Sequence, residues 1–158
     1  MSLGVMLFLA FCIGIVAGLR SLTAPAVVAW AAHLGWIDLS VSRLAFMGSA
    51  WFVGIFTLLA LLELVTDQLP KTPARTTAVP LAARIIMGSL SGACLGIAGD
   101  TSLLLGALFG GTGGIAGAFA GYNARVGLVR ALDVPDFAIA IPEDLIAVGF
   151  GLLIASRF

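Results

Sequence analysis

The stretch LAFMGSAWFVGIFTLLALLELV, residues 44–65, decides the fold class of this chain. It is uncharged until Glu63, and it is long enough to cross the hydrocarbon core of a bilayer, which takes about 20 apolar residues in a helix. The whole chain has the same character, since 61% of its 158 residues are hydrophobic, 10% are charged, and the mean hydropathy is +1.16. So few charges cannot cover a water-facing surface of this size. The composition therefore excludes an ordinary soluble enzyme and a disordered chain, and it predicts a multi-span protein surrounded by the lipid bilayer.

The small counts of charged and metal-binding residues exclude further classes. Eight basic and eight acidic residues give a formal net charge of zero, so we expect no nucleic-acid partner. The two cysteines, Cys12 and Cys94, lie in apolar runs, and His33 is the single histidine. We therefore expect no disulfide framework, no metal site and no cofactor. Catalytic signatures such as Gly-x-Ser-x-Gly and His-Glu-x-x-His are missing from the sequence, and we expect no enzyme.

Six apolar stretches predict an all-helical membrane protein that forms a single domain over residues 1–158. The second stretch is short and begins with Ser and Thr, which are typical of helix starts, so it either spans the membrane or forms a re-entrant half-helix. Three residues separate the fourth and fifth stretches, which predicts a tight hairpin. The six stretches are Leu3–Leu19, Ser21–Ile37, Leu44–Val65, Leu81–Gly99, Leu103–Tyr122 and Phe137–Ser156.

The distribution of positive charge predicts how the chain lies in the membrane, because basic residues of short loops collect on the cytoplasmic side. With six crossings, six of the eight basic residues share one side and both termini lie outside. With a re-entrant second stretch, the division is five against three, so we favour six crossings. The six basic residues of the cytoplasmic side are then Arg20, Lys71, Arg75, Arg84, Arg125 and Arg130, opposite Arg43 and Arg157.

A short internal repeat supports six crossings. GIVAGLRSL at residues 14–22 is similar to GIAGDTSL at residues 96–103, with one gap. Each segment lies at the turn between the first and second stretch of one half of the chain. The match predicts a weak inverted three-plus-three repeat, an arrangement that many small transporters use.

Glycines recur every four residues in the fourth and fifth stretches, which places each series on one helix face. Small residues let helices approach closely in lipid. Such faces serve packing within one subunit, a homo-oligomer interface, sliding helices or a pathway lined by backbone. Two of them on Leu103–Tyr122 predict that this helix is central and packed on both sides. The series are Gly88, Gly92 and Gly96; Gly106, Gly110 and Gly114; and Gly113, Gly117 and Gly121.

Charged residues near the ends of the stretches form the candidate site. An unpaired charge in hydrocarbon costs about 2.5–3.5 kcal/mol, so these residues are expected to pair or to reach the interface. They form either an ion-pair network that fixes the helices or a binding site for an ion, a proton or a polar headgroup. Glu63 lies deepest within its apolar run and shares a helix face with Asp67. The candidate ion or substrate ligands are Glu63, Asp67, Arg20, Arg84, Glu143 and Asp144.

The polar loop after the third stretch is a candidate site for an anion or a lipid headgroup. Lys71 and Arg75 supply charge there, and Thr76 and Thr77 precede a helix start, where free N–H groups point outward. The alternative is a plain cytoplasmic positive loop.

Several short motifs, in a fixed order, resemble a known family. They are GLR at 18–20, LGW at 34–36, LExxxDxxP at 62–70, RT at 75–76 with Pro80, and ED at 143–144. Together they resemble the small bacterial membrane proteins of the domain of unknown function family 4126, DUF4126, from about Gly14 to Phe158. The resemblance implies an integral bacterial membrane protein and carries no established activity. The positions that match the recurring polar residues of the family are Arg20, Glu63, Asp67, Glu143 and Asp144.

The function hypothesis is a small transporter or channel for an ion or a small polar solute, multi-pass in the bacterial inner membrane. Glu63 and Asp67 would carry the cation or proton, and Arg20 and Arg84 would hold or gate them. We expect a homo-oligomer, because 158 residues offer few helices to enclose a path. The alternative is a non-transporting membrane protein that binds lipid headgroups or scaffolds a membrane complex.

Overall fold

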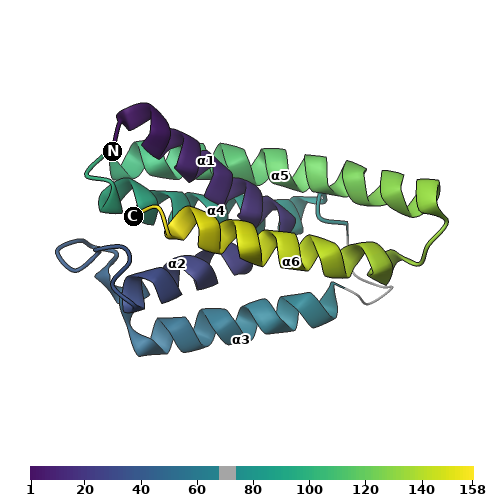
Figure 1. The fold of residues 1–158 in the computed structure, drawn as a ribbon, viewed down its shortest axis with the longest axis horizontal. Coiled ribbons are helices and arrows are strands. Elements are labelled where there is room, and N and C mark those ends of the chain that lie inside the picture. The colour runs from purple at the N-terminus through teal and green to yellow at the C-terminus, as the bar shows by residue number, and fades with distance from the viewer. Residues whose placement is uncertain (68–73) are drawn as a thin grey trace.

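The computed structural model describes residues 1–67 and 74–158, which form six α-helices, one short 3₁₀ helix and no strand. The predicted all-helical class is therefore confirmed. Successive helices run in alternating directions, so both chain termini lie at the same end of the bundle (Figure 1). The elements are α1 (Leu3–Leu19), α2 (Thr23–His33), η1 (Ala45–Gly48), α3 (Ala50–Thr66), α4 (Ala78–Ala98), α5 (Leu103–Leu132) and α6 (Asp136–Ala155).

Three helices, α4, α5 and α6, are long and apolar enough to cross a membrane. The helices α1 and α3 are also apolar but have 17 residues each, and α2 has 11. The longest helix, α5, has 30 residues and is therefore about 45 Å long at 1.5 Å per residue, more than the ~30 Å of a hydrocarbon core. Six crossings stay a prediction.

The helices α2 and α3 are shorter than the stretches predicted for them. At the end of α2, Gly35 adopts a φ of +76°, and the Trp36 N–H turns back to the Ala31 carbonyl oxygen at 2.8 Å. This glycine-based cap ends the helix four residues before the predicted Ile37. The predicted third stretch is broken ahead of α3, because the extended Ser49 caps the new helix through its side chain.

The helix α5 is longer than predicted, and this corrects the interpretation of residues 123–136 as a polar connection. It continues ten residues beyond Tyr122 and ends before Asp133, which has a φ of +50°. The segment contains no proline before Pro135, so nothing in it forbids a helix. The α4–α5 connection is the tight hairpin that the sequence predicted, with four residues between the helices.

The helix α5 packs against α1 on one face and α4 on another. A Cβ atom added at Gly88 of α4 would lie 2.6 Å from the Gly110 carbonyl oxygen, so these backbones are in direct contact. The prediction that this helix is packed on both sides is confirmed, but the more central helix is α1, which contacts α2, α4, α5 and α6. The glycine series serve packing inside one chain: Gly106, Gly110 and Gly114 lie against α4, and Gly113 and Gly117 lie against α1.

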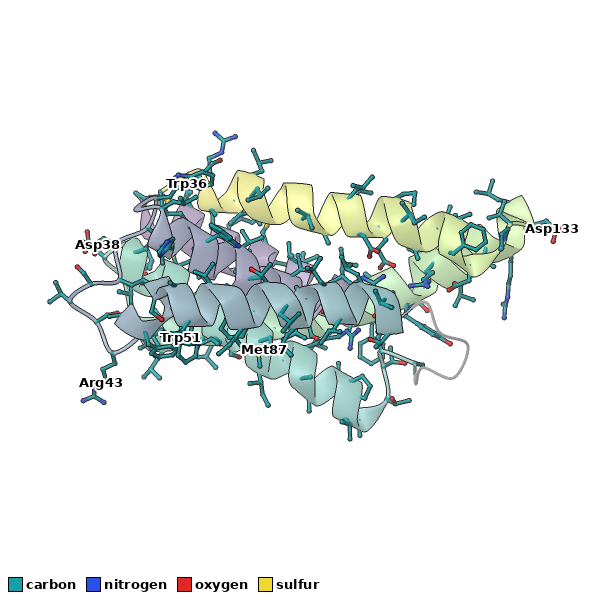
Figure 2. All side chains as sticks on the ribbon, turned by 90° about the horizontal axis from the view of Figure 1, so that it is seen from below. Trp36, Asp38, Arg43, Trp51, Met87 and Asp133 are labelled. Atoms are coloured by element: carbon teal, nitrogen blue, oxygen red, sulfur yellow. The ribbon has the colours of Figure 1, made fainter. Side chains whose placement is uncertain are left out.

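The two ends of the bundle differ in composition. Trp36, Asp38, Arg43 and Trp51 gather at the end that holds the termini, and Asp133 marks the opposite end (Figure 2).

The repeat segments 14–22 and 96–103 include the α1–α2 and α4–α5 turns. The α4–α5 turn lies at the end of the bundle that holds the termini, and the α1–α2 turn lies away from that end (Figure 1). The matching second helices differ in length, with 11 residues in α2 and 30 in α5, and the inverted repeat stays a prediction.

Candidate functional site

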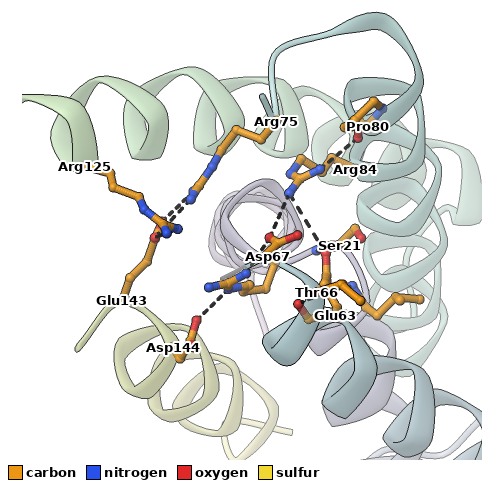
Figure 3. A network of polar contacts seen from close by, with 12 residues as sticks. Ser21, Glu63, Thr66, Asp67, Arg75, Pro80, Arg84, Arg125, Glu143 and Asp144 are labelled. Carbon is orange, nitrogen blue, oxygen red and sulfur yellow. Dashed lines mark hydrogen bonds and ion pairs between the residues drawn. The ribbon is translucent and has the colours of Figure 1, made fainter. Parts of the chain in front are cut away.

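The candidate site surrounds Arg20, which follows α1 directly and is completely buried. The Arg20 Nε donates a hydrogen bond to Asp144 Oδ1 of α6 at 2.5 Å, and the Nη1 donates one to Asp67 at the end of α3. Dashed lines in Figure 3 mark the polar contacts of this region. One guanidinium therefore joins the α1–α2 turn to two helices that are distant in sequence.

Glu63 of α3 caps the start of α2. Its Oε1 accepts hydrogen bonds from the Ser21 backbone N–H at 2.8 Å and from the Ser21 hydroxyl at 2.6 Å. Its Oε2 accepts from the Leu22 N–H at 2.8 Å. The sequence predicted that Ser and Thr side chains would open this helix, whereas a carboxylate from another helix satisfies its free N–H groups. Glu63 is thus a positioning residue for the α1–α2 turn.

Arg84 of α4 lies between the backbone of α1 and the carboxylates of α3. Its Nε donates to the Gly18 carbonyl oxygen, and its Nη1 donates to the Pro80 carbonyl oxygen, each at 3.1 Å. Its Nη2 lies 3.7 Å from Asp67 Oδ2 and 4.0 Å from Glu63 Oε1. Arg84 therefore supplies positive charge to both carboxylates while its hydrogen bonds hold α1 against α4.

A second group of ion pairs lies beside the first and joins α5 and α6 to the start of α4. Glu143 accepts from Arg75 at 2.5 Å and 3.0 Å in a two-pronged pair, and from Arg125 of α5 at 3.4 Å. Arg125 also pairs with Asp136 at the first turn of α6. Adjacent residues of α6, Glu143 and Asp144, therefore bind different arginines and connect the two groups (Figure 3).

The charges of this network balance in its buried part. Four buried or nearly buried arginines face four carboxylates that are at most 18% exposed, while the side chain of Asp136 is 60% exposed and solvated. Asp144 lies eight residues inside α6, about 12 Å from the start of that helix. The four arginines are Arg20, Arg75, Arg84 and Arg125, and the four carboxylates are Glu63, Asp67, Glu143 and Asp144.

One donor of the network has no partner. Among the described residues, the Nη2 of Arg20 is the buried side-chain nitrogen that makes no hydrogen bond. An unsatisfied buried donor costs about 1–3 kcal/mol, and more on a charged group. The described contacts therefore leave part of the donor capacity of Arg20 unused.

A cavity of about 250 Å³ adjoins the network between α5 and α6. Its wall is mostly apolar, and the charged residues that line it are Arg125 and Glu143. Within the described part of the chain, no group of three or more His, Cys, Asp or Glu side chains is placed to hold a metal ion. The network brings several carboxylates within reach of shared arginines, since Asp67 contacts Arg20 and Arg84, and Glu143 contacts Arg75 and Arg125.

All six predicted ion or substrate ligands lie in this one network. Of the two predicted anion ligands, Arg75 is buried in the same network, and Lys71 lies outside the described residues. Arg130, expected beside the network, is exposed near the end of α5. The sequence prediction missed Asp136 and the two N–H groups that Glu63 caps. The available signal for such a cap was a carboxylate, Glu63, two residues before the predicted helix end at Val65.

The arrangement can now be compared with known proteins. The family model described as Domain of unknown function (DUF4126) matches residues 7–156. The chain belongs to this family. The resemblance inferred from the short motifs is thus confirmed over nearly the whole DUF4126 chain, and every residue of the network lies within the matched range. No curated protein and no solved structure matches it.

Proposed function

We propose that this DUF4126 protein is a small membrane transporter or channel for an ion or a small polar solute, and that the charge network around Arg20 is its binding site. The observation that carries the proposal is a charge-balanced network of arginines and carboxylates that joins five of the six helices of an apolar chain. Charged groups enclosed by membrane helices are expensive and mark ion or substrate paths in membrane proteins.

The proposed topology has six crossings of a bacterial inner membrane, with the network towards the cytoplasm. The alternating helix directions support it, as do the arginines, five of which lie at or near the network end (Figure 1). The opposite end carries Trp36 and Trp51 beside Arg43, and tryptophan rings favour the membrane–water interface (Figure 2).

The roles within the site follow from the contacts. Glu63 already accepts three hydrogen bonds and serves to position the turn, so we move the exchangeable role from Glu63 to Asp67 and Asp144. Both bind the guanidinium of Arg20, whose third nitrogen is free to bind a solute oxygen. A transported ion or solute would enter by exchange of partners at Arg20, with Arg84 holding Asp67 in place.

The alternative function, binding of lipid headgroups through the loop before α4, has less support. Arg75 is 7% exposed, and both of its terminal nitrogens donate to Glu143. A guanidinium held in a two-pronged pair has few donors left for a headgroup phosphate. We also propose a homo-oligomer on the ground of the small number of helices, with contacts outside the glycine faces that α1, α4 and α5 already use.

The test is flux through proteoliposomes that contain the purified protein. Counterflow and electrical recordings would screen sodium, potassium, chloride, acetate and phosphate. Arg20→Gln should abolish the flux, whereas Arg43→Gln, the same substitution in the loop at the other end of the bundle, should leave it unchanged. Asp144→Asn provides a second variant if Arg20→Gln does not yield a monodisperse protein. Absence of flux for every solute, or equal flux in the Arg20 and Arg43 variants, would overturn the proposal.

A further inference from the structure

The chemistry of the solute follows from the free nitrogen of Arg20. A guanidinium only donates hydrogen bonds, so its Nη2 must bind an acceptor. The three nitrogens share one carbon atom, and the other two already hold Asp67 and Asp144. A solute oxygen at Nη2 would therefore lie beside both carboxylates. Planar oxygen groups such as carboxylates and oxyanions fit a guanidinium best.

An anion cannot enter this network alone. The four arginines are already balanced by four carboxylates that are at most 18% exposed, so one more negative charge would be uncompensated in this enclosed network. Repulsion from Asp67 and Asp144 would add to the cost. A proton that neutralises one of the network carboxylates restores the balance.

Asp144 is the carboxylate best placed to take this proton. Among the described residues, its ion pair is with Arg20 alone, at 2.5 Å. Asp67 has both Arg20 and Arg84, Glu143 has both Arg75 and Arg125, and Glu63 accepts three hydrogen bonds. The Asp144 side chain is also 13% exposed, so it is not sealed inside the chain.

We propose that Arg20 binds the oxygen of a carboxylate or oxyanion at Nη2, and that the anion binds together with one proton on Asp144. The proton comes from solution and forms an O–H bond on Asp144, and no other covalent bond changes. The carbonyl oxygen of neutral Asp144 still accepts from the Nε–H of Arg20, while the anion accepts from Nη2. This inference rests on the proposed function and names its solute as an anion that moves with a proton.

The other charged groups of the network lie on the elements around Asp144, and their charges affect how readily Asp144 takes up a proton. Asp67 of α3 and Glu143 of α6 oppose ionisation of Asp144, while the arginines favour it. The groups are Arg20 at the α1–α2 turn, Asp67 of α3, Arg75 before α4, Arg84 of α4, Arg125 of α5 and Glu143 of α6.

The test is thermal stabilisation of the purified full-length protein in detergent by sodium acetate, sodium nitrate and sodium phosphate, with sodium chloride of equal ionic strength as reference. If one proton accompanies the anion, the apparent affinity for nitrate, which stays a monoanion from about pH 5.5 to about pH 7.5, falls by about tenfold per unit of pH wherever Asp144 is ionised in the free protein. The amide of Asp144→Asn imitates the protonated side chain, so this variant should bind nitrate equally well at about pH 5.5 and about pH 7.5.

The matched control is Asp100→Asn, the same substitution in the α4–α5 hairpin at the other end of the bundle. Asp100 has a φ of +52°, which asparagine also tolerates, so this variant should keep the wild-type pH dependence. The inference is overturned if no oxyanion stabilises the protein beyond chloride, or if Asp144→Asn keeps the wild-type pH dependence. Flux assays separate the two proposals: proton-dependent binding without flux contradicts transport, and flux that ignores Asp144→Asn contradicts the coupled proton.

Discussion

Replacing Gly18 by alanine should push α1 away from α5. A Cβ atom at this position would lie 2.5 Å from the Gly114 carbonyl oxygen and 2.6 Å from both Ala118 N and Gly117 Cα. All three atoms belong to the backbone of α5 and cannot rotate out of the way. Ordinary contacts of this kind lie near ~3.5 Å, so the two helices must separate by about 1 Å.

The expected cost follows from this separation. A gap of about 1 Å forfeits a quarter to a half of the attraction between atoms across the interface, and overpacked cores lose typically about 1–3 kcal/mol. Alanine returns up to about 1 kcal/mol through its helix propensity. The Gly18 carbonyl also accepts from Arg84 Nε at 3.1 Å, so movement of α1 strains the charge network as well. We expect Gly18→Ala to lower the free energy of unfolding by about 1–2 kcal/mol.

The control is Gly54→Ala in α3, where a Cβ atom would meet nothing within 4 Å. This variant should be unchanged or stabilised by up to about 1 kcal/mol. The assay is reversible unfolding in mixed micelles of a mild detergent and dodecyl sulfate, followed by circular dichroism. Equal stabilities of Gly18→Ala and Gly54→Ala would refute the reasoning that backbone contact between α1 and α5 holds the bundle together.

Three further predictions concern other parts of the chain. Glu63→Gln should lower the free energy of unfolding by about 2–3 kcal/mol in the same assay. The Leu22 N–H now donates to a carboxylate oxygen, and in the variant it would face the amide N–H₂, which is also a donor. A stability equal to wild type would contradict the capping role. Single cysteines at Ser40 and Ala74, in a background without native cysteines, should react with impermeant reagents from opposite sides of the membrane, and labelling from the same side would exclude six crossings. The Ser40 hydroxyl and N–H lower the pKa of Asp38, so the stability that its carboxylate contributes is present above the unfolded value and lost as the pH falls through the lowered pKa. Ser40→Ala should raise that pKa towards its ordinary value, as a carbon-13 NMR titration would measure, and an unchanged titration would contradict the assignment.

Much of the fold was predictable because its signals are local. Apolar run length placed all six helices, and the bounds of α1 agree with the predicted Leu3–Leu19. The glycine spacing identified the two packed faces of α5, since a period of four has few uses besides close helix contact. The errors lie where backbone conformation decides: the positive φ of Gly35 ends α2, and the absence of a breaker before Pro135 lengthens α5.

The membership of the site was predictable, but the roles within it were not. The high cost of a lone charge in lipid brings the charged residues together, whatever their exact partners. The choice of partners depends on distances of a few ångströms between helices. Glu63 was expected to carry an ion, but its carboxylate reaches the free N–H groups of the α1–α2 turn, because that turn lies beside the last turns of α3. The proposal gives the exchangeable role to Asp144 because its described ion pair is with Arg20 alone.

The pairing of Arg20 has a consequence for how the chain is made. Its partners arrive late in synthesis, since Asp67 follows by 47 residues and Asp144 by 124. An unfinished or truncated chain therefore presents an arginine whose opposite charges have not yet reached the bilayer. The guanidinium of Arg20 has both of its counter-charges only after α6 has joined the bundle, so the last helix to be made completes the pairing of the first.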